Sequence, residues 1–186
     1  MIYTRADLSI YLKADSARYG NKPPTIIDRI LKNEKWYISQ YIRALRHVEF
    51  YINTGKKKSI CFLFWWCRYK HLSFKTHITI YPNTCGEGVY IPHIGDMIWV
   101  KSSARIGRNC TLRPGVVIGK KGVENAVDAP VTVGDNVNFG LGVRVLGKLH
   151  IGNNVSIGAN SVVTKDIPDN AVAVGLPASV IKILED

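Results

Sequence analysis

The chain has 186 residues, 46% of them hydrophobic, and 25 Lys and Arg against 14 Asp and Glu give it a net charge of +11. This length predicts one or two domains with a core. The charge favours an anionic partner, but no zinc-finger or aromatic RNA-binding signature accompanies it, so a phosphate-rich small molecule is expected rather than a nucleic acid. The longest apolar run, residues 60–67, is too short to cross a bilayer, and the first residues lack a signal-peptide core. Both observations predict a cytoplasmic protein.

The four cysteines, Cys61, Cys67, Cys85 and Cys110, form no C-x-x-C pair. We expect all four to be buried free thiols in a reducing compartment rather than partners in disulfides. No metal site is expected from their spacing.

Residues 1–75 are predicted to form a helical N-terminal domain. Thr4 and Asp7, and again Thr25 and Asp28, have the spacing of a capping box at the start of a helix. Apolar residues at three- and four-residue spacing predict a third helix that ends at Gly55. A fourth helix is expected over residues 56–71.

The expected fourth helix is too apolar for an ordinary surface helix. Several of its apolar residues can share one face: Ile60, Leu63, Phe64, Cys67 and Leu72. We expect this face to pack on the β-rich part of the chain or on another subunit. The alternative is peripheral contact with the inner face of a membrane, through Phe62, Trp65 and Trp66 beside the lysines at 56–58.

From residue 133 the chain repeats every six residues. Apolar side chains occupy the first position of each repeat, at Val133, Phe139, Val145, Ile151, Ile157 and Val163. A period of six fits neither an amphipathic helix nor simple strand alternation, but it is typical of a parallel β-helix in which three short strands complete one coil. Residues 18 apart are then expected to stack, Phe139 on Ile157 and Val145 on Val163.

The same phase is found upstream, at Val100, Ile106, Leu112 and Ile118, so a β-helix is predicted for residues 76–170. Fifteen residues separate Ile118 from Val133, three more than two repeats, which predicts a loop at 119–132. Glycine and two prolines after residue 170 interrupt the repeat, and 171–186 are expected to form a C-terminal tail. The predicted fold class is mainly β, with an N-terminal α-helical region.

His93 is the strongest candidate for a catalytic side chain. His47 and His71 are expected to be solvated on helices, and His150 to point outward from its repeat. His93 differs because it lies between Pro92 and Gly95, at a corner where the repeat changes phase. A histidine there can take a proton from a hydroxyl near neutral pH.

These features resemble the hexapeptide-repeat acyltransferases, and among them the serine acetyltransferases and the capsular polysaccharide O-acetyltransferases. Residues 86–93, Gly-Glu-Gly-Val-Tyr-Ile-Pro-His, are similar to the segment that carries the catalytic histidine of serine acetyltransferases. Residues 157–178 are similar to acetyl-CoA-dependent members generally. The resemblance implies a left-handed β-helix, acetyl-CoA as co-substrate without a metal, and a homotrimer with active sites between subunits.

The resemblance also implies roles for single residues. His93 would take the proton of an acceptor hydroxyl as its oxygen attacks the thioester of acetyl-CoA. The pantetheine arm and the phosphates of CoA would be bound by Gly119, Gly140, Gly158, Ala159, Lys165 and Lys182. We assign Pro92, Asp96 and Asp128 to the acceptor side of the site, with Asp96 or Asp128 as candidates to orient His93.

Three positions depart from the serine acetyltransferase pattern. Thr79 replaces an aspartate that orients the histidine, Pro92 replaces an acidic residue, and residues 127–130 lack an Arg-His pair that holds the amino-acid substrate. We therefore expect an O-acetyltransferase that acts on a sugar hydroxyl of a surface polysaccharide or its precursor. The first alternative is a serine O-acetyltransferase of cysteine biosynthesis. The second is a non-catalytic β-helix scaffold.

Overall fold

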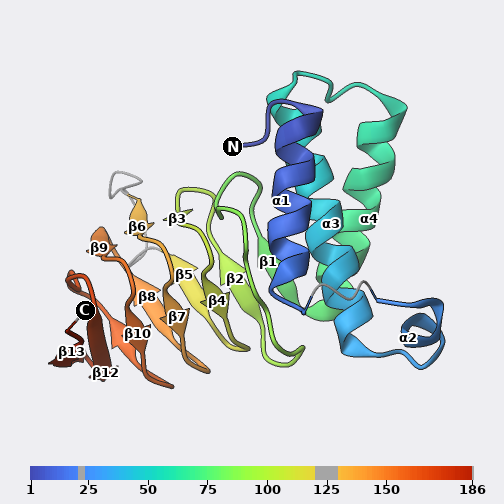
Figure 1. The fold of residues 1–186 in the computed structure, drawn as a ribbon. Helices are drawn as coiled ribbons and strands as arrows, with labels where there is room; N and C mark the ends of the chain where they lie inside the picture. The colour runs from blue at the N-terminus through green and yellow to red at the C-terminus, as the bar shows by residue number, and fades with distance from the viewer. Residues whose placement is uncertain (21–23, 120–129, 186) are drawn as a thin grey trace.

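The computed structural model describes residues 1–20, 24–119 and 130–185, which form a layer of helices at one end of a β-helix (Figure 1). The helices are α1 (Arg5–Ala17), α2 (Ile26–Ile30), α3 (Glu34–Asn53) and α4 (Ile60–Thr76). The strands are β1 (Ile78–Ile80), β2 (Ile98–Val100), β3 (Arg105–Ile106), β4 (Thr111–Leu112), β5 (Val117–Gly119), β6 (Val131–Val133), β7 (Asn138–Phe139), β8 (Arg144–Leu146), β9 (Leu149–Ile151), β10 (Ser156–Ile157), β11 (Val162–Val163), β12 (Ala171–Gly175) and β13 (Ala178–Ile183).

The first helices begin where the capping boxes predict. The Thr4 hydroxyl accepts a hydrogen bond from the Asp7 N–H at 3.0 Å, and the Asp7 carboxylate accepts one from the Thr4 N–H at 2.8 Å. Thr25 and Asp28 repeat this arrangement at the start of α2. Both boxes satisfy N–H groups that a helix leaves unpaired at its first turn.

Helix α4 begins at Ile60, four residues later than predicted, and it continues to Thr76. Ser59 caps it, because its hydroxyl accepts a hydrogen bond from the Phe62 N–H at 3.1 Å. The three lysines at 56–58 therefore lie in the turn before the helix. The prediction overlooked Ser59 as an N-cap residue.

Of the five residues predicted to form the packing face of α4, only Leu72 is buried. Tyr69 and Leu72 are buried, and Phe62, Trp65 and Trp66 pack against the core, whereas Ile60, Leu63 and Phe64 are exposed. Hydrogen bonds hold the helix in this rotation, since the Tyr69 hydroxyl donates to the Ile80 carbonyl at 2.8 Å and Ser73 donates to the Ile78 carbonyl at 2.6 Å. Sequence periodicity could not anticipate these contacts with β1.

The cysteine prediction is correct for two residues and wrong for two. Cys85 and Cys110 are buried free thiols, while Cys61 and Cys67 are free but exposed on α4. Their exposure has the same cause as that of Ile60 and Leu63, because the rotation of α4 turns this face outward.

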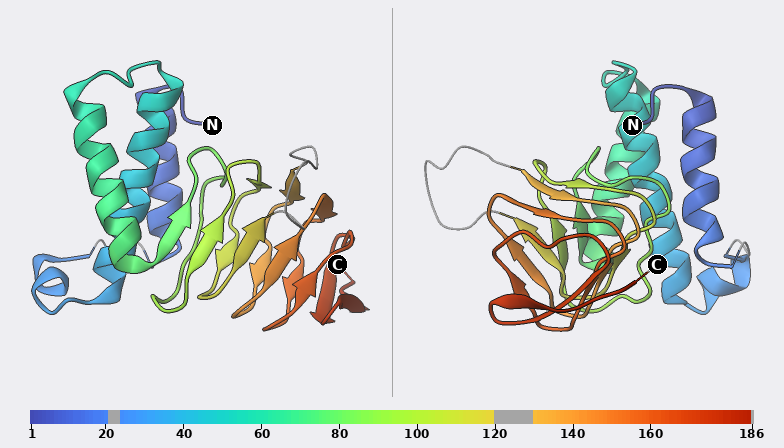
Figure 2. Two further views of the ribbon diagram at one scale, coloured as in Figure 1. Left: turned by 180° about the vertical axis from the view of Figure 1, so that it is seen from behind. Right: turned by 60° about the vertical axis from the view of Figure 1, so that its left-hand side comes forward.

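The strands form three parallel faces that wind around one core, as the repeat predicts. Sheet A contains β1, β2, β5, β8 and β11; sheet B contains β3, β6 and β9; sheet C contains β4, β7, β10, β12 and β13. Successive coils lie one behind another in the right-hand view of Figure 2. Phe139 pairs with Ile157 and Val145 with Val163, which confirms the predicted 18-residue stacking.

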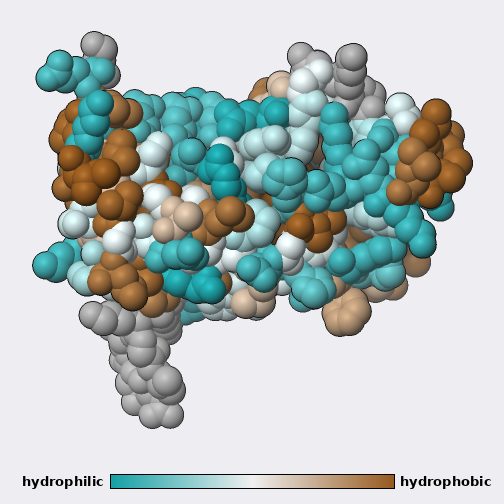
Figure 3. Space-filling model, turned by 90° about the horizontal axis from the view of Figure 1, so that it is seen from below, coloured by the Kyte–Doolittle hydropathy of each residue, from teal (hydrophilic) through white to brown (hydrophobic). Residues whose placement is uncertain are grey.

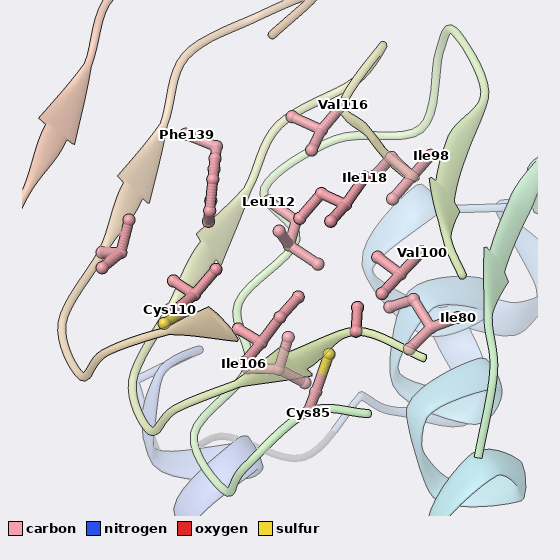
Figure 4. Packing of buried hydrophobic residues seen from close by; sticks show 14 of the residues in the cluster. Ile80, Cys85, Ile98, Val100, Ile106, Cys110, Leu112, Val116, Ile118 and Phe139 are labelled. Atoms are coloured by element: carbon pink, nitrogen blue, oxygen red, sulfur yellow. The ribbon is translucent and has the colours of Figure 1, made fainter. Parts of the chain in front are cut away.

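Apolar side chains fill the interior of the β-helix (Figure 4). All six residues at the first position of the repeat are buried, and so are the residues four places after each, including Ser161. The Ser161 hydroxyl accepts a hydrogen bond from the Gly175 N–H at 3.1 Å. This partner satisfies a polar group that would otherwise be costly in an apolar core.

Asparagine and glycine form the corners that need a left-handed backbone. Gly115, Gly142 and Asn160 have φ values of 82°, 69° and 57° on one edge of the coil. On another edge, Asn154 accepts a side-chain hydrogen bond from Asn136 and donates one to Asn170, so the corner residues of successive coils form a ladder. Asparagine tolerates positive φ better than most residues with a Cβ.

The C-terminal part extends the β-helix before it turns back. Strand β12 pairs in parallel with β10, beyond residue 170 where the predicted tail starts, and β13 then pairs antiparallel with β12. Residues 120–129 of the loop predicted at 119–132 lie outside the described residues, whereas Gly119 belongs to β5 and Val131 and Thr132 belong to β6, so the prediction is wrong at those three positions. In the described part of the chain, no helix has the length and apolarity of a membrane span. Seen from below, exposed apolar side chains gather over α2 at one end and over the C-terminal strands at the other (Figure 3).

Candidate active site

His93 lies at the first corner of one edge of the β-helix. Tyr90 forms a bridge to Thr111 of sheet C, and β2 of sheet A begins at Ile98, so residues 91–97 connect these two sheets. We call this the C–A edge, and its later corners are residues 113–116, 140–143 and 158–161. The His93 side chain is 68% exposed. The phase change seen in the sequence is thus an enlarged corner that presents an imidazole to solvent.

Glu34, the first residue of α3, holds His93. One carboxylate oxygen, Oε1, lies 2.7 Å from His93 Nδ1, and the other, Oε2, accepts a hydrogen bond from the Ile94 N–H at 3.1 Å. Asn33 caps this helix, since its side chain accepts a hydrogen bond from the Lys35 N–H at 3.3 Å, and Glu34 lies in the first turn. The sequence prediction named Asp96 or Asp128 for this role, and for Asp96 it is wrong, because the carboxylate at His93 comes from a helix 59 residues earlier.

The charge on Glu34 sets the tautomer of His93. Burial acts to raise the pKa of Glu34, but the hydrogen bonds from His93 and the Ile94 N–H outweigh it, so the pKa is lowered. The position at a helix N-terminus also favours the ionised carboxylate. Because an ionised carboxylate can only accept, His93 Nδ1 must carry the proton. In the neutral ring, Nε2 then has a free lone pair with which to accept a proton.

The helical layer fixes the rest of the segment that carries His93. The Tyr19 hydroxyl accepts from the Ile91 N–H and donates to the Ile91 carbonyl, both at 3.0 Å. Asp15 accepts from the N–H groups of Gly88 and Val89 at 2.8 and 3.0 Å. Backbone and side chain are therefore both held by α1 and α3, and the imidazole is preorganised.

A buried ionic cluster lies behind these contacts. Arg46 is 0% exposed and binds Asp15 at 2.8 Å and Glu49 at 3.0 Å. Its guanidinium also donates to the carbonyls of Cys85 and Gly86, at 2.9 and 2.6 Å. Burial acts to raise the pKa of Glu49, and the pKa is indeed raised even though Arg46 opposes this. The cluster thus joins α1, α3 and the start of the His93 segment with each charge paired.

Three of the predicted cofactor residues share the edge of His93. Gly140 lies at the third corner of the C–A edge, and Gly158 and Ala159 lie at the fourth. Consecutive corners are bonded, from the Gly115 N–H to the Asp96 carbonyl at 3.2 Å, and from the Gly142 N–H to the Pro114 carbonyl at 2.9 Å. With strands ~4.8 Å apart, Gly140 and Gly158 are about 10 and 15 Å from His93 along the axis.

The remaining predicted residues do not join that edge. Gly119 ends β5, and Lys165 follows β11, so both lie on the side of sheet A that leads to sheet B. Lys182 is exposed on β13, opposite Val172. The spacing of these residues in the sequence could not show which of them lie on the C–A edge and which lie between sheets A and B, because every edge of the β-helix recurs with the same period. Asp128 lies outside the described residues, and Pro92 is half-buried next to His93.

Two arginines of the C–A edge were missed. Arg113 Nη1 contacts the side chain of Asn138 and the Phe139 carbonyl. Arg144 Nη1 contacts the carbonyls of Gly115 and Gly142. Both are half-buried cations among backbone carbonyls. The sequence did place both arginines at outward positions of the repeat, one directly after a strand and one within a strand. This signal was too weak to identify them as site residues, because an outward arginine is usually only a solvated surface residue.

The other histidines are not part of this site. His150 is exposed, as predicted, with Nδ1 3.0 Å from the Thr132 hydroxyl, and His71 is exposed as well. His47 is not solvated as expected, since it stacks on Trp65 with ring centroids 3.8 Å apart. Burial lowers its pKa. Among the described residues, no group of three His, Cys, Asp or Glu side chains is arranged to hold a metal ion.

Sequence comparison with known proteins finds a hexapeptide-repeat family and serine acetyltransferases. The family described as "Hexapeptide repeat of succinyl-transferase" matches residues 130–165 and 148–172. Serine acetyltransferase of Synechococcus elongatus is 39% identical over 113 residues, covering 60% of this chain and 46% of that protein. Serine acetyltransferase of Staphylococcus xylosus is 39% identical over 110 residues, covering 59% and 50%. The chain thus spans about half the length of the curated relatives it matches.

Solved structures agree in fold. The soybean serine acetyltransferase apoenzyme superposes with a TM-score of 0.75 at 24% identity, over 95% of this chain and 69% of that one. Serine acetyltransferase of Brucella abortus strain S19 in complex with coenzyme A gives a TM-score of 0.73 at 24% identity, over 97% and 70%. The predicted left-handed β-helix is the fold of these structures.

These relatives contradict the prediction of a polysaccharide O-acetyltransferase, because the curated and solved proteins similar to this chain are named serine acetyltransferases. That prediction rested on missing family residues, two of them in the segment 127–130. A missing side chain shows only that the substrate is not held at that position. The chain thus carries a hexapeptide repeat, has the fold of the solved serine acetyltransferases, and is similar in sequence to curated serine acetyltransferases over about three fifths of its length.

Proposed function

We propose that this chain is an acetyl-CoA-dependent serine O-acetyltransferase, in which His93 is the general base and Glu34 positions it. The observation that carries the proposal is the 2.7 Å contact between Glu34 Oε1 and His93 Nδ1, which leaves Nε2 to accept a proton. The similarity to serine acetyltransferases over three fifths of the chain supports serine as the acceptor.

In the proposed reaction, His93 Nε2 takes the proton of the serine hydroxyl as its oxygen forms a bond to the acetyl carbon. The C–S bond of the thioester breaks, and the proton passes from His93 to the departing sulfur, so the products are O-acetylserine and free CoA. Glu34 stabilises the protonated ring that exists between these transfers. A general base of this kind contributes about 10²–10⁴ in rate.

Acetyl-CoA supplies the activated acyl group. The C–A edge suits its long arm, since Gly140, Gly158 and Ala159 carry small or no side chains and are half-buried or exposed. The glycines also have a packing role, because a Cβ on Gly140 would lie 2.6 Å from the Ala159 nitrogen. We assign Gly119, Lys165 and Lys182 only to the wider CoA surface, because they lie off this edge.

Arg113 is our candidate for the serine carboxylate, in place of the missing Arg-His pair. Pro114 packs against the His93 corner, where a Cβ on Gly95 would meet its side chain at 3.2 Å. Arg113 precedes this contact and keeps further N–H donors beyond Nη1 with which to bind a carboxylate. Asp96 lies on the same corner and is exposed, where it can face the amino group of serine.

We also propose a homotrimer with the site between subunits. An imidazole that is 68% exposed in a single chain is open to water, and acyl transfer to serine requires water to be kept away from the thioester. A neighbouring β-helix over the C–A edge would provide that cover. Light scattering of the purified protein tests the assembly.

The experiment that tests the activity measures thiol release from acetyl-CoA in the presence of L-serine. Wild type should release thiol with serine and not with L-alanine, which lacks the hydroxyl. His93→Ala should lower the rate by about 10²–10⁴. His150→Ala, which removes an exposed imidazole elsewhere on the β-helix, is the matched control and should keep the wild-type rate.

Two outcomes would overturn the proposal. One is thiol release that serine does not stimulate, and the other is a His93→Ala rate equal to that of His150→Ala. Serinamide tests whether Arg113 binds the carboxylate of serine, because serinamide keeps the hydroxyl but lacks the carboxylate. Arg113→Gln should raise KM for serine and leave KM for serinamide unchanged.

A further inference from the structure

Helix α4 exposes an apolar stripe that no part of the described chain covers. Ile60, Leu63, Phe64 and Phe74 have 78%, 53%, 58% and 86% of their surface exposed. With the exposed Cys67, they fall at intervals of three, four and seven residues, so they lie along one side of the helix. Figure 1 shows α4 beside α3 at the outer side of the helical layer, with the β-helix extending away from it.

The charge around this stripe has one sign. Between Phe50 and Gly86 the chain has six Lys and Arg residues and no Asp or Glu. The lysines at 56–58 are exposed in the turn before α4, and Lys70 and Lys75 are exposed farther along the helix. An exposed apolar stripe with basic residues beside it and at one end is the pattern of a helix that lies in a membrane interface.

We propose that this surface, defined by Ile60, Leu63, Phe64 and Phe74 with the lysines at 56–58, docks on an anionic phospholipid bilayer. The helix would lie parallel to the membrane, with the apolar stripe among the acyl chains and the lysines at the headgroups. This inference is independent of the proposed activity, and it assigns the exposed side chains rather than the partly buried Trp65 and Trp66 to the contact.

Charge distinguishes a bilayer from a second copy of the chain. Two copies joined through this stripe would bring two sets of basic residues together without an acidic partner from the same segment. Like charges at close range oppose such a contact, whereas anionic headgroups neutralise the lysines. An anionic lipid surface therefore suits both the apolar and the charged part of the region.

The experiment is flotation of the full chain with liposomes of phosphatidylcholine alone or with phosphatidylglycerol. Wild type should float with the anionic vesicles, and the binding should weaken as salt rises. Replacing the three lysines at 56–58 with glutamine should lower partitioning by about 10²-fold, since each basic residue near an anionic surface contributes about fivefold. Leu63→Ser with Phe64→Ser should also abolish binding.

The control is Ile27→Ser with Ile30→Ser, which removes two side chains of similar exposure from α2. Both double variants change exposed positions, so their folds are checked by thermal unfolding. The proposal is overturned if wild type fails to float with anionic vesicles, or if both double variants float equally well. It is also overturned if Leu63→Ser with Phe64→Ser reduces the assembly state seen by light scattering, because the stripe then binds another copy.

Discussion

The β-helix and the helical layer contribute differently to the same site. In the β-helix, burial follows a period of six, and each coil pairs with the next in register. In the helical layer, the decisive contacts are single ones, such as Glu34 to His93 and Asp15 to the Gly88 N–H. The repeat provides a rigid edge, and the helices fix the one corner of it that carries the base.

This difference explains why the first coil departs from the repeat. Residues 91–97 are longer than the later corners of the C–A edge, so they cannot be held by coil-to-coil hydrogen bonds alone. Tyr19 and Glu34 supply the missing partners at Ile91, His93 and Ile94. A regular repeat is stable but uniform, and a specific site needs contacts from outside it.

The largest effect is expected where the two regions join. Arg46→Met should lower the free energy of unfolding by about 3–5 kcal/mol, because it leaves Asp15 and Glu49 buried without their cation. The loss should shrink as pH falls, because burial raises the pKa of Glu49 and its protonation removes an unpaired buried charge. Urea denaturation at pH 7 and pH 5 measures both. A loss below 1 kcal/mol at pH 7 would show that the cluster does not secure the junction.

A core change inside the repeat should affect stability without affecting the site. Phe139 is 0% exposed and lies between Leu112 and Ile157 of the adjacent coils. Phe139→Ala should cost about 3–5 kcal/mol, while Phe74→Ala, at a position 86% exposed, should stay within about 0.5 kcal/mol. Urea denaturation measures the cost. At 25 °C the folded Phe139→Ala protein should retain its rate with serine, and a large rate loss would contradict the division between the regions.

Glu34→Gln should change the site without affecting the repeat. It keeps an acceptor for the Ile94 N–H but removes the charge at His93, and the rate with serine should fall about 10- to 100-fold, less than for His93→Ala. Glu185→Gln, at an exposed position near the C-terminus, is the control. Equal rates for the two variants would remove Glu34 from the mechanism.

The contact between Glu34 and His93 should also make the stability of the protein depend on pH. Because the pKa of Glu34 is lowered below its ordinary 4.5, the stabilising contribution of the pair is present above pH 4.5 and is lost as the pH falls through the lowered value. Carbon-13 NMR of the Glu34 carboxyl should show this low midpoint, and His93→Ala should raise it. An unchanged midpoint would mean that His93 does not stabilise the carboxylate.

The smallest effect is expected at a corner of the repeat. Asn154 has a φ of 56° and bonds to the asparagines of both neighbouring coils. Asn154→Ala should cost about 1–2 kcal/mol because alanine is strained at positive φ, and Asn154→Gly should cost less because glycine is not. Thermal unfolding compares the two. If alanine and glycine cost the same, the ladder bonds and not the backbone conformation stabilise this corner.

The amino-acid order alone was sufficient for the β-helix, the capping boxes at Thr4 and Thr25, and the position of His93 at an irregular corner of the repeat. Those features are local or periodic, so neighbouring residues in the chain carry the whole signal. The sequence was not sufficient for the exposed side of α4, the grouping of the glycines by edge, or the carboxylate that holds His93. Glu34 is 59 residues from His93, and no spacing rule connects them. Contacts of that kind exist only after the helical layer packs on the first coil, because packing and not periodicity selects which side chains meet.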